Sequence, residues 1–235
     1  MASDRTAELF DAVYANLDDD GARLVLADHL SQLGDPRGEL IALQCAAEPT
    51  AEQRARTEHL LAHHGWRWLR QGGLEVMSSR YERGFPVAVE LTVDQKSEGA
   101  PAWRTIREVV LVNQRFVATP LRHPVCANVR VVHHVDPRTL QYLTNEGATL
   151  PYEELSFLDT DGAFVWLAHR WTMFPALRRL ELTYARDLGA VRAFLSDHPL
   201  DRLTIREFLP EHLTLVGERL RQIASRGGKI EATWS

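Results

Sequence analysis

A short apolar strand pattern recurs between about Val87 and Thr233, and this recurrence restricts the possible folds more than any other feature. Seven segments carry the pattern, and the first inward-facing residues of these segments are Val89, Val109, Val129, Leu155, Leu180, Leu203 and Ile230. The intervals between them are 20, 20, 26, 25, 23 and 27 residues. A unit that repeats in this way predicts a repeat architecture, in which each unit adds one strand beside the previous strand.

The spacing and the apolar frame are those of leucine-rich repeats, whose units are about 20–29 residues long. The frame L-x-x-L-x-L, with conservative replacements, occupies residues 106–111, 177–182 and 200–205. The consensus asparagine of such repeats is largely missing, and the residues in its place are Gln114, His134, Thr160, Ala185 and Phe208. The sequence therefore predicts an irregular leucine-rich-repeat-like solenoid over residues 73–235, with about seven strands.

Helical patterns lie between the predicted strands, so the sequence predicts an α/β fold. They cover residues 137–143, 163–171, 189–195 and 210–224. Alternating strands and helices with short links predict a parallel sheet, here with the helices on one face. An ordinary doubly wound fold, with helices on both faces, is the alternative, but its strands are apolar on both sides. One exposed face is favoured by the polar residues at outward positions: Glu90, Thr92, Arg130, Ser156, Glu181, Thr183, Arg206, Glu231 and Thr233.

Residues 1–72 are predicted to form a helical N-terminal module that caps the solenoid. Apolar residues at helical spacing predict four helices, over about 6–17, 20–33, 36–47 and 51–69. The inner side of the second helix is expected to hold Leu24, Val25, Ala27, Leu30 and Leu33. The aspartates at positions 18–20 are expected to cap this helix rather than to bind a metal ion.

Two motifs in this module carry a family resemblance. They read DDDGARLVLADHL at residues 18–30 and GDPRGELIALQ at residues 34–44, and the later RGF at residues 83–85 belongs with them. From about Ala7 to Val93 the chain resembles the bacterial repeat-companion domain, which is known from myxobacteria and planctomycetes. The chain departs from that pattern at His29, where the family has Trp. The resemblance implies a helical module attached to leucine-rich-type repeats, and it implies no reaction.

The motif residues are expected to have structural roles, and they are Arg23, Asp28, Gly34, Asp35, Pro36, Arg37 and Gly38. Gly34 is expected to end the second helix, and Asp35 and Pro36 to begin the third. A buried ion pair between Asp28 and Arg37 is expected to link the two helices. Loss of either partner of such a pair is costly because the other charge stays buried.

The outward face of the strands is the predicted partner-binding surface. Its candidate residues are Glu90, Val110, Val112, Arg130, Val132, Ser156, Leu158, Glu181 and Arg206. Four of them, Val110, Val112, Val132 and Leu158, form an apolar patch where a solvated face is otherwise polar, and such patches often mark interaction sites. Two alternatives stay open: a loop such as residues 95–101 covers the patch, or the strand frame is shifted by one residue.

Catalytic chemistry has little support in the sequence. His59 and His63 lie four residues apart on a helix, with His64 adjacent, and this spacing can present two imidazoles to one metal ion. A metal-dependent enzyme is therefore the alternative from a different class, although a third ligand and a general base are not apparent. No nucleophile elbow and no phosphate-binding glycine loop occurs, so no catalytic residue, resident metal or cofactor is expected.

The composition limits the classes of partner and the compartment that we expect for this chain. The net charge is −5, with 27 Lys+Arg against 32 Asp+Glu, which disfavours nucleic acid. The first residues lack the pattern of a signal peptide, and no apolar run is long enough for a membrane helix. Cys45 and Cys126 are expected to be reduced thiols in the cytoplasm. We therefore expect a non-catalytic interaction or scaffolding module that binds another protein, or a structural subunit that docks through its helical module.

Overall fold

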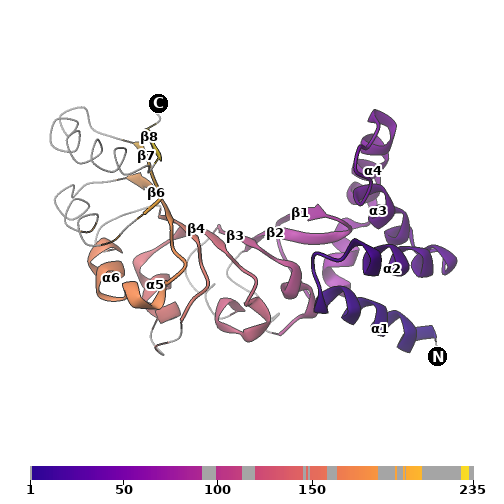
Figure 1. The fold of residues 1–235 in the computed structure, drawn as a ribbon, viewed down its shortest axis with the longest axis horizontal. Helices are drawn as coiled ribbons and strands as arrows, with labels where there is room; N and C mark the ends of the chain where they lie inside the picture. The colour runs from indigo at the N-terminus through magenta and orange to yellow at the C-terminus, as the bar shows by residue number, and fades with distance from the viewer. Residues whose placement is uncertain are drawn as a thin grey trace.

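The protein is an elongated α/β molecule with helices at its N-terminal end and a curved sheet extending away from them (Figure 1). The computed structural model describes residues 2–91, 99–112, 120–144, 147, 149–157, 163–184, 194, 198, 200–207 and 229–232. The expected helix over 210–224 lies outside the described residues, as do Leu158 and nearly all of the expected helix over 189–195. Within the described part, the expected α/β class is confirmed.

Four helices form the N-terminal module: α1 (Ala2–Ala15), α2 (Asp20–Gln32), α3 (Pro36–Gln44) and α4 (Ala51–Gln71). The predicted caps are confirmed for α2 and α3. The Asp19 side chain accepts hydrogen bonds from the first amides of α2, and the Asp35 side chain accepts one from the Arg37 amide. Each cap satisfies amides that have no partner within the helix. Gly34 follows α2 with a φ of 73°, the left-handed conformation that ends many helices.

Helices α2 and α3 pack closely because Gly38 has no side chain. A Cβ atom at this position would lie 2.5 Å from the carbonyl oxygen of Ala27 and 2.5 Å from the hydroxyl of Ser31. The core of the module contains Leu9, Val13, Leu26, Ala27, Leu30, Ile41 and Phe85. Leu24, Val25 and Leu33 were expected in this core but are 44%, 52% and 54% exposed. That expectation was wrong because the buried Arg23, and not Leu24, faces inward at the start of α2.

The sheet has eight strands, and each pairs with the next strand along the chain. The first two, β1 (Ser78–Glu82) and β2 (Phe85–Leu91), form an antiparallel hairpin. Six more strands follow in parallel: β3 (Glu108–Leu111), β4 (Val131–Val135), β5 (Glu154–Phe157), β6 (Arg179–Tyr184), β7 (Arg202–Glu207) and β8 (Lys229–Ala232). The sequence pattern missed β1 because Ser-Ser-Arg-Tyr-Glu contains only one apolar side chain.

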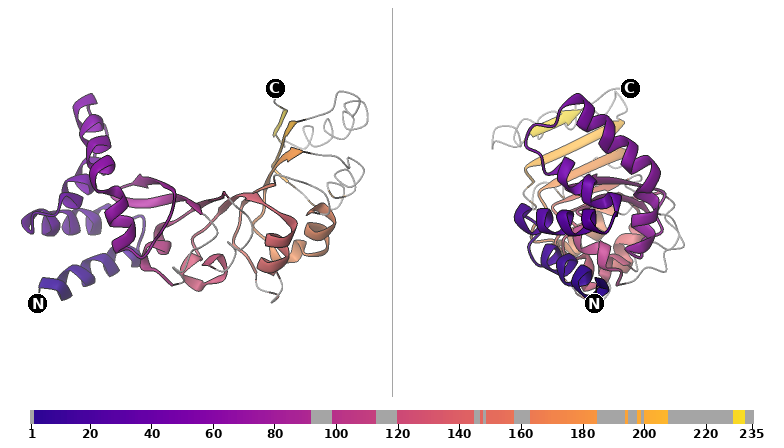
Figure 2. Two further views of the ribbon diagram at one scale, coloured as in Figure 1. Left: turned by 180° about the vertical axis from the view of Figure 1, so that it is seen from behind. Right: turned by 90° about the vertical axis from the view of Figure 1, so that its right-hand side faces the viewer.

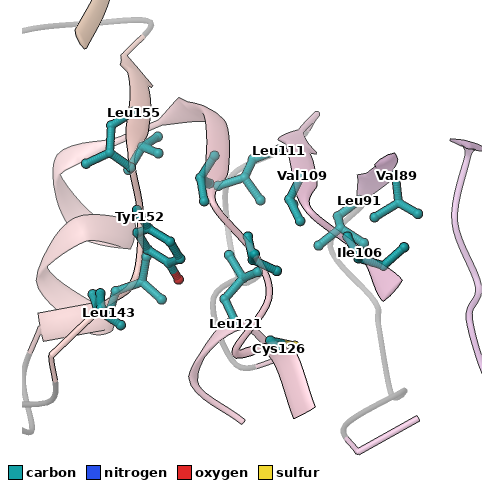
Figure 3. Close-up of a cluster of buried hydrophobic side chains, with 14 of the residues drawn as sticks. Val89, Leu91, Ile106, Val109, Leu111, Leu121, Cys126, Leu143, Tyr152 and Leu155 are labelled. Carbon is teal, nitrogen blue, oxygen red and sulfur yellow. The ribbon is translucent and has the colours of Figure 1, made fainter. Parts of the chain in front are cut away.

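One face of the sheet carries the core. Helices α5 (Pro137–Thr144) and α6 (Ala163–His169) lie on the same side of the strands (Figures 1 and 2). Inward side chains from β2, β3 and β5 meet Leu121, Cys126 and Leu143 from the connecting segments (Figure 3). The register places in one buried row Val89, Val109, Val132, Leu155, Leu180 and Leu203. Alternate strand residues therefore point to the opposite face.

The frame predicted for the fourth strand was wrong. Val129 was expected in the core row and Val132 on the outward face, but Val132 pairs with Val109 and Leu155 and is fully buried. Residues 129–135 contain four valines, so the apolar pattern fits more than one frame. Backbone pairing selects the frame of this strand, because the Arg130 amide donates a hydrogen bond to the Arg107 carbonyl at 2.8 Å. A register shift then follows between Val132 and Val135.

We expect Gly38→Ala to destabilise the protein by about 1–3 kcal/mol, because the added methyl group collides with the backbone of α2. Gly65→Ala is the matched control. Gly65 is also buried in a helix, but an added Cβ atom would find its nearest neighbour 4.0 Å away, at Leu61. This change should stabilise the protein by about 0.5–1 kcal/mol through reduced chain entropy. Urea unfolding measures both values, and equal effects of the two changes would contradict the close packing of α2 on α3.

Candidate functional site

The sheet face opposite α5 and α6, which we call the open face, is the candidate site. Its outward side chains come from β2 to β6 and form two rows across the strands. The first row contains Ala88, Glu108, Val131, Glu154 and Arg179. The second row contains Glu90, Val110 and His133 and, beyond the register shift in β4, Ser156 and Glu181. Helix α4 stands at one end of this face and strands β6–β8 at the other (Figure 1). The open face is therefore a broad surface between two raised ends.

Three valines form an apolar patch on the open face, which we call the valine patch. Val110 and Val131 are half-buried on neighbouring strands, and Val112 is 46% exposed. The Val112 amide donates to the Leu91 carbonyl at 3.0 Å, so Val112 continues the pairing of β3 with β2. The valine patch is thus held by the sheet backbone, not by a free loop.

Charged side chains pair across the strands on both sides of the valine patch. Glu108 accepts from Arg80 at 2.9 Å and lies 3.3 Å from the Nε2 atom of His133. Further along the sheet, the Nε atom of Arg179 donates to Glu154 at 2.6 Å. Such partly exposed pairs contribute little to stability. They surround the apolar patch with fixed charges of both signs, which is the composition of an interface rim.

Four of the predicted partner-binding residues lie outward on the sheet with accessible side chains: Glu90, Val110, Val112 and Glu181. Ser156 also points outward by register, but it is only 1% exposed and its Oγ atom accepts the His134 amide at 3.4 Å. Arg206 lies in β7.

Two other predicted residues do not belong to the open face. Val132 is in the core, and Arg130 precedes β4, where its side chain binds the carbonyl groups of Ala127 and Val129. Both errors follow from the shifted frame of the fourth strand. The correct frame places Val131 and His133 outward instead, and alignment of the Val129-x-x-Val132 spacing with Ile106-x-x-Val109 could have revealed them.

Arg37 occupies the junction between the helical module and the sheet. Its guanidinium carbon lies 4.8 Å from the ring centroid of Phe10 and 4.8 Å from that of Phe85, and its Nε atom donates to the Gly84 carbonyl at 3.3 Å. Burial lowers the pKa of Arg37. The two aromatic faces therefore supply much of the favourable environment that a buried guanidinium requires.

The expected ion pair between Asp28 and Arg37 was wrong, because the Asp28 side chain is exposed while Arg37 is buried. The second motif arginine, Arg23, is also buried and lies 5.6 Å from the ring centroid of Phe85. Gly34, Asp35 and Pro36 have the structural roles that were expected, Gly34 and Asp35 at helix ends and Pro36 in the first turn. Gly38 lies at the close approach of α2 and α3, a role that the sequence analysis did not predict.

The histidines of α4 form a pair. The rings of His59 and His63 lie with their centroids 4.0 Å apart, and the Nδ1 atom of His63 is 2.7 Å from the carbonyl oxygen of His59. Within the parts of the chain that the structure describes, no group of three or more His, Cys, Asp or Glu gathers as metal ligands.

No family model, curated protein or solved structure matches this chain. The similarity of residues 7–93 to the repeat-companion domain therefore rests on the quoted motifs and stays a prediction. Among the described helices, none has both the length and the apolar character needed to cross a membrane.

We expect Arg37→Lys to destabilise the protein by about 1–2 kcal/mol. A lysine ammonium cannot lie flat between two rings while donating to the Gly84 carbonyl. Arg56→Lys is the control, because Arg56 is exposed and forms a paired hydrogen bond with Glu39 at the surface. It should leave the unfolding midpoint nearly unchanged. A smaller loss for Arg37→Lys than for Arg56→Lys would show that the aromatic pair does not hold the guanidinium.

Proposed function

We propose that this chain is a non-catalytic protein-binding module: a leucine-rich-repeat-like solenoid that binds a partner protein through its open face. The carrying observation is the valine patch, which the strands hold on the side of the sheet opposite the core and in which Val112 is 46% exposed. Exposed apolar side chains within a charged rim favour a protein surface of complementary pattern as the ligand.

The repeat interpretation draws support from the positions just before the strands. A buried or half-buried apolar residue lies three positions before the first core residue of each strand from β3 to β7: Ile106, Val129, Tyr152, Leu177 and Leu200. One backbone hydrogen bond between successive units recurs with the same spacing as these residues. The Arg107 carbonyl accepts the Arg130 amide, the Arg130 carbonyl accepts the Glu153 amide, and the Glu153 carbonyl accepts the Arg178 amide. One strand and one return segment per unit is the pattern of a solenoid.

The state of the cysteines also fits this proposal. Cys45 and Cys126 are not joined in a disulfide bond. Burial raises the pKa of Cys126 to about 12, so this thiol is protonated at neutral pH and is a poor nucleophile. Reduced cysteines fit a reducing compartment, and a cytoplasmic location is therefore part of the proposal.

A second candidate function is docking through the helical module. Its support is the exposure of Leu24, Val25 and Leu33 on α2, three large apolar side chains on one helix. In this arrangement the module attaches the chain to a larger assembly, and the sheet is a structural extension. The open face remains the first proposal because its valines lie within a charged rim.

Two aspartate substitutions distinguish the surfaces. Val112 is 46% exposed on the open face and Val25 is 52% exposed on α2, so the same change is made at valines of similar exposure. Wild-type protein, Val112→Asp and Val25→Asp serve as bait in cells that produce the protein, and mass spectrometry identifies what each bait retains. We expect Val112→Asp to lose a partner that the other two retain, because a buried unpaired carboxylate is costly in an interface.

Thermal unfolding of each variant provides the folding control, and both should unfold cooperatively near the wild-type midpoint. Loss of the partner with Val25→Asp alone would transfer the function to α2. Retention of every partner by the folded Val112→Asp variant would rule out the valine patch as the binding site.

A further inference from the structure

A small cavity lies at the junction of the helical module and the sheet, away from the valine patch. Its volume is about 60 Å³. Three arginines line it, Arg23 from α2, Arg83 from the turn between β1 and β2, and Arg107 just before β3. The rest of the lining is Glu82, Thr105 and the apolar side chains of Leu17, Phe85 and Val87.

Arg23 is the decisive residue, because it is buried and incompletely bonded. It is only 4% exposed, and one N–H group donates to the Asp19 carbonyl at 3.2 Å. Its Nε atom is buried and has no hydrogen-bond partner among the described residues. An unpartnered charged donor in a protein interior is energetically costly, so this N–H group would gain from a further acceptor.

The charges around the cavity leave a positive excess at Arg23. Arg83 lies 3.3 Å from Asp20, and Arg107 lies 3.4 Å from Asp18. Asp18 is 86% exposed, whereas the Asp20 side chain is 46% exposed and its Oδ1 atom is buried without a hydrogen-bond partner among the described residues. Glu82 also lines the cavity, and its carboxylate pairs with Arg80. After burial, the positive charge of Arg83 is the largest influence that lowers the pKa of Arg23, and the Asp20 carboxylate acts in the opposite direction.

We propose that this cavity, which we call the arginine pocket, binds one oxyanion group, a phosphate or a carboxylate. The Nε atom of Arg23 would donate to one oxygen, while Arg83 and Arg107 supply charge from the rim. Guanidinium groups match both oxyanions because their N–H donors lie in a planar fork. The volume admits a few atoms only, so the ligand is a free small anion or the anionic end of a larger one.

Ordered water is the competing occupant. A site of this size can hold a few water molecules, and one of them could accept from the Arg23 Nε atom. Water carries no net charge, however, whereas an anion would offset the positive charge that remains at Arg23. The arginine pocket is independent of the partner surface proposed above, because the lining contains none of the three valines.

Thermal unfolding in the presence of small anions tests the arginine pocket. The full chain is titrated at pH 7 with sodium phosphate and, separately, with sodium acetate, each against sodium chloride at equal ionic strength. A ligand that binds only the folded state raises the unfolding midpoint as its concentration passes the dissociation constant. We expect a saturable rise with phosphate or acetate and none with chloride. The anion that produces the rise identifies the source of the oxyanion.

Variants decide whether the anion binds at the arginine pocket. Arg83→Gln and Arg107→Gln remove rim charges at positions 42% and 49% exposed, so both variants should fold. Arg104→Gln is the matched control, because Arg104 is 47% exposed and pairs with Asp11 at 3.4 Å, outside the pocket lining. We expect the first two variants to weaken anion binding at least tenfold, by calorimetry, and the control to bind like the wild type.

Two results would overturn the proposal. The absence of any response to phosphate and acetate would leave water as the occupant of the cavity. An equal response in all three variants would show general screening of surface charge by an adventitious ion only. In either case the binding of a partner at the valine patch would be unaffected, so the two proposals fail separately.

Discussion

The junction at Phe85 is the constraint on which the rest of the structure depends. Phe85 begins β2, and its ring lies beside the guanidinium groups of both Arg37 and Arg23. Gly84 precedes it with a φ of 80° and lies against Ile41, where a side chain would collide. Strand β2 is thereby fixed to the helical module. Since every later strand pairs with the strand before it, the position of β2 sets the position of the whole sheet.

Two buried arginines at this junction have different roles. Arg37 lies between two aromatic rings and donates to a backbone carbonyl, so its charge is accommodated within the protein. Arg23 has one aromatic face and an unpartnered Nε atom beside a cavity. The sequence motifs place both arginines in the same module. Only their surroundings distinguish the two, because one guanidinium is enclosed by aromatic rings and the other borders the arginine pocket.

The open face follows from one-sided packing of the sheet. Inward side chains meet the connecting segments and helices, so the outward rows are free to carry charges in cross-strand pairs. Within such a face, Val112 is 46% exposed. In the proposed complex, a partner surface would cover this side chain.

The sequence by itself determined the class of fold, the four N-terminal helices and the caps of α2 and α3, because apolar periodicity and capping residues act over a few neighbouring positions. It did not fix every boundary, since the first helix is Ala2–Ala15 and not 6–17, and the third ends at Gln44 and not near residue 47. It did not determine the frame of β4, where four valines in seven residues satisfy more than one alternation and a backbone hydrogen bond to Arg107 selects one. Nor did it distinguish Arg23 from Leu24 as the inward residue of α2. That choice depends on Phe85, which lies about sixty positions away in the chain and is brought close only by the tertiary fold.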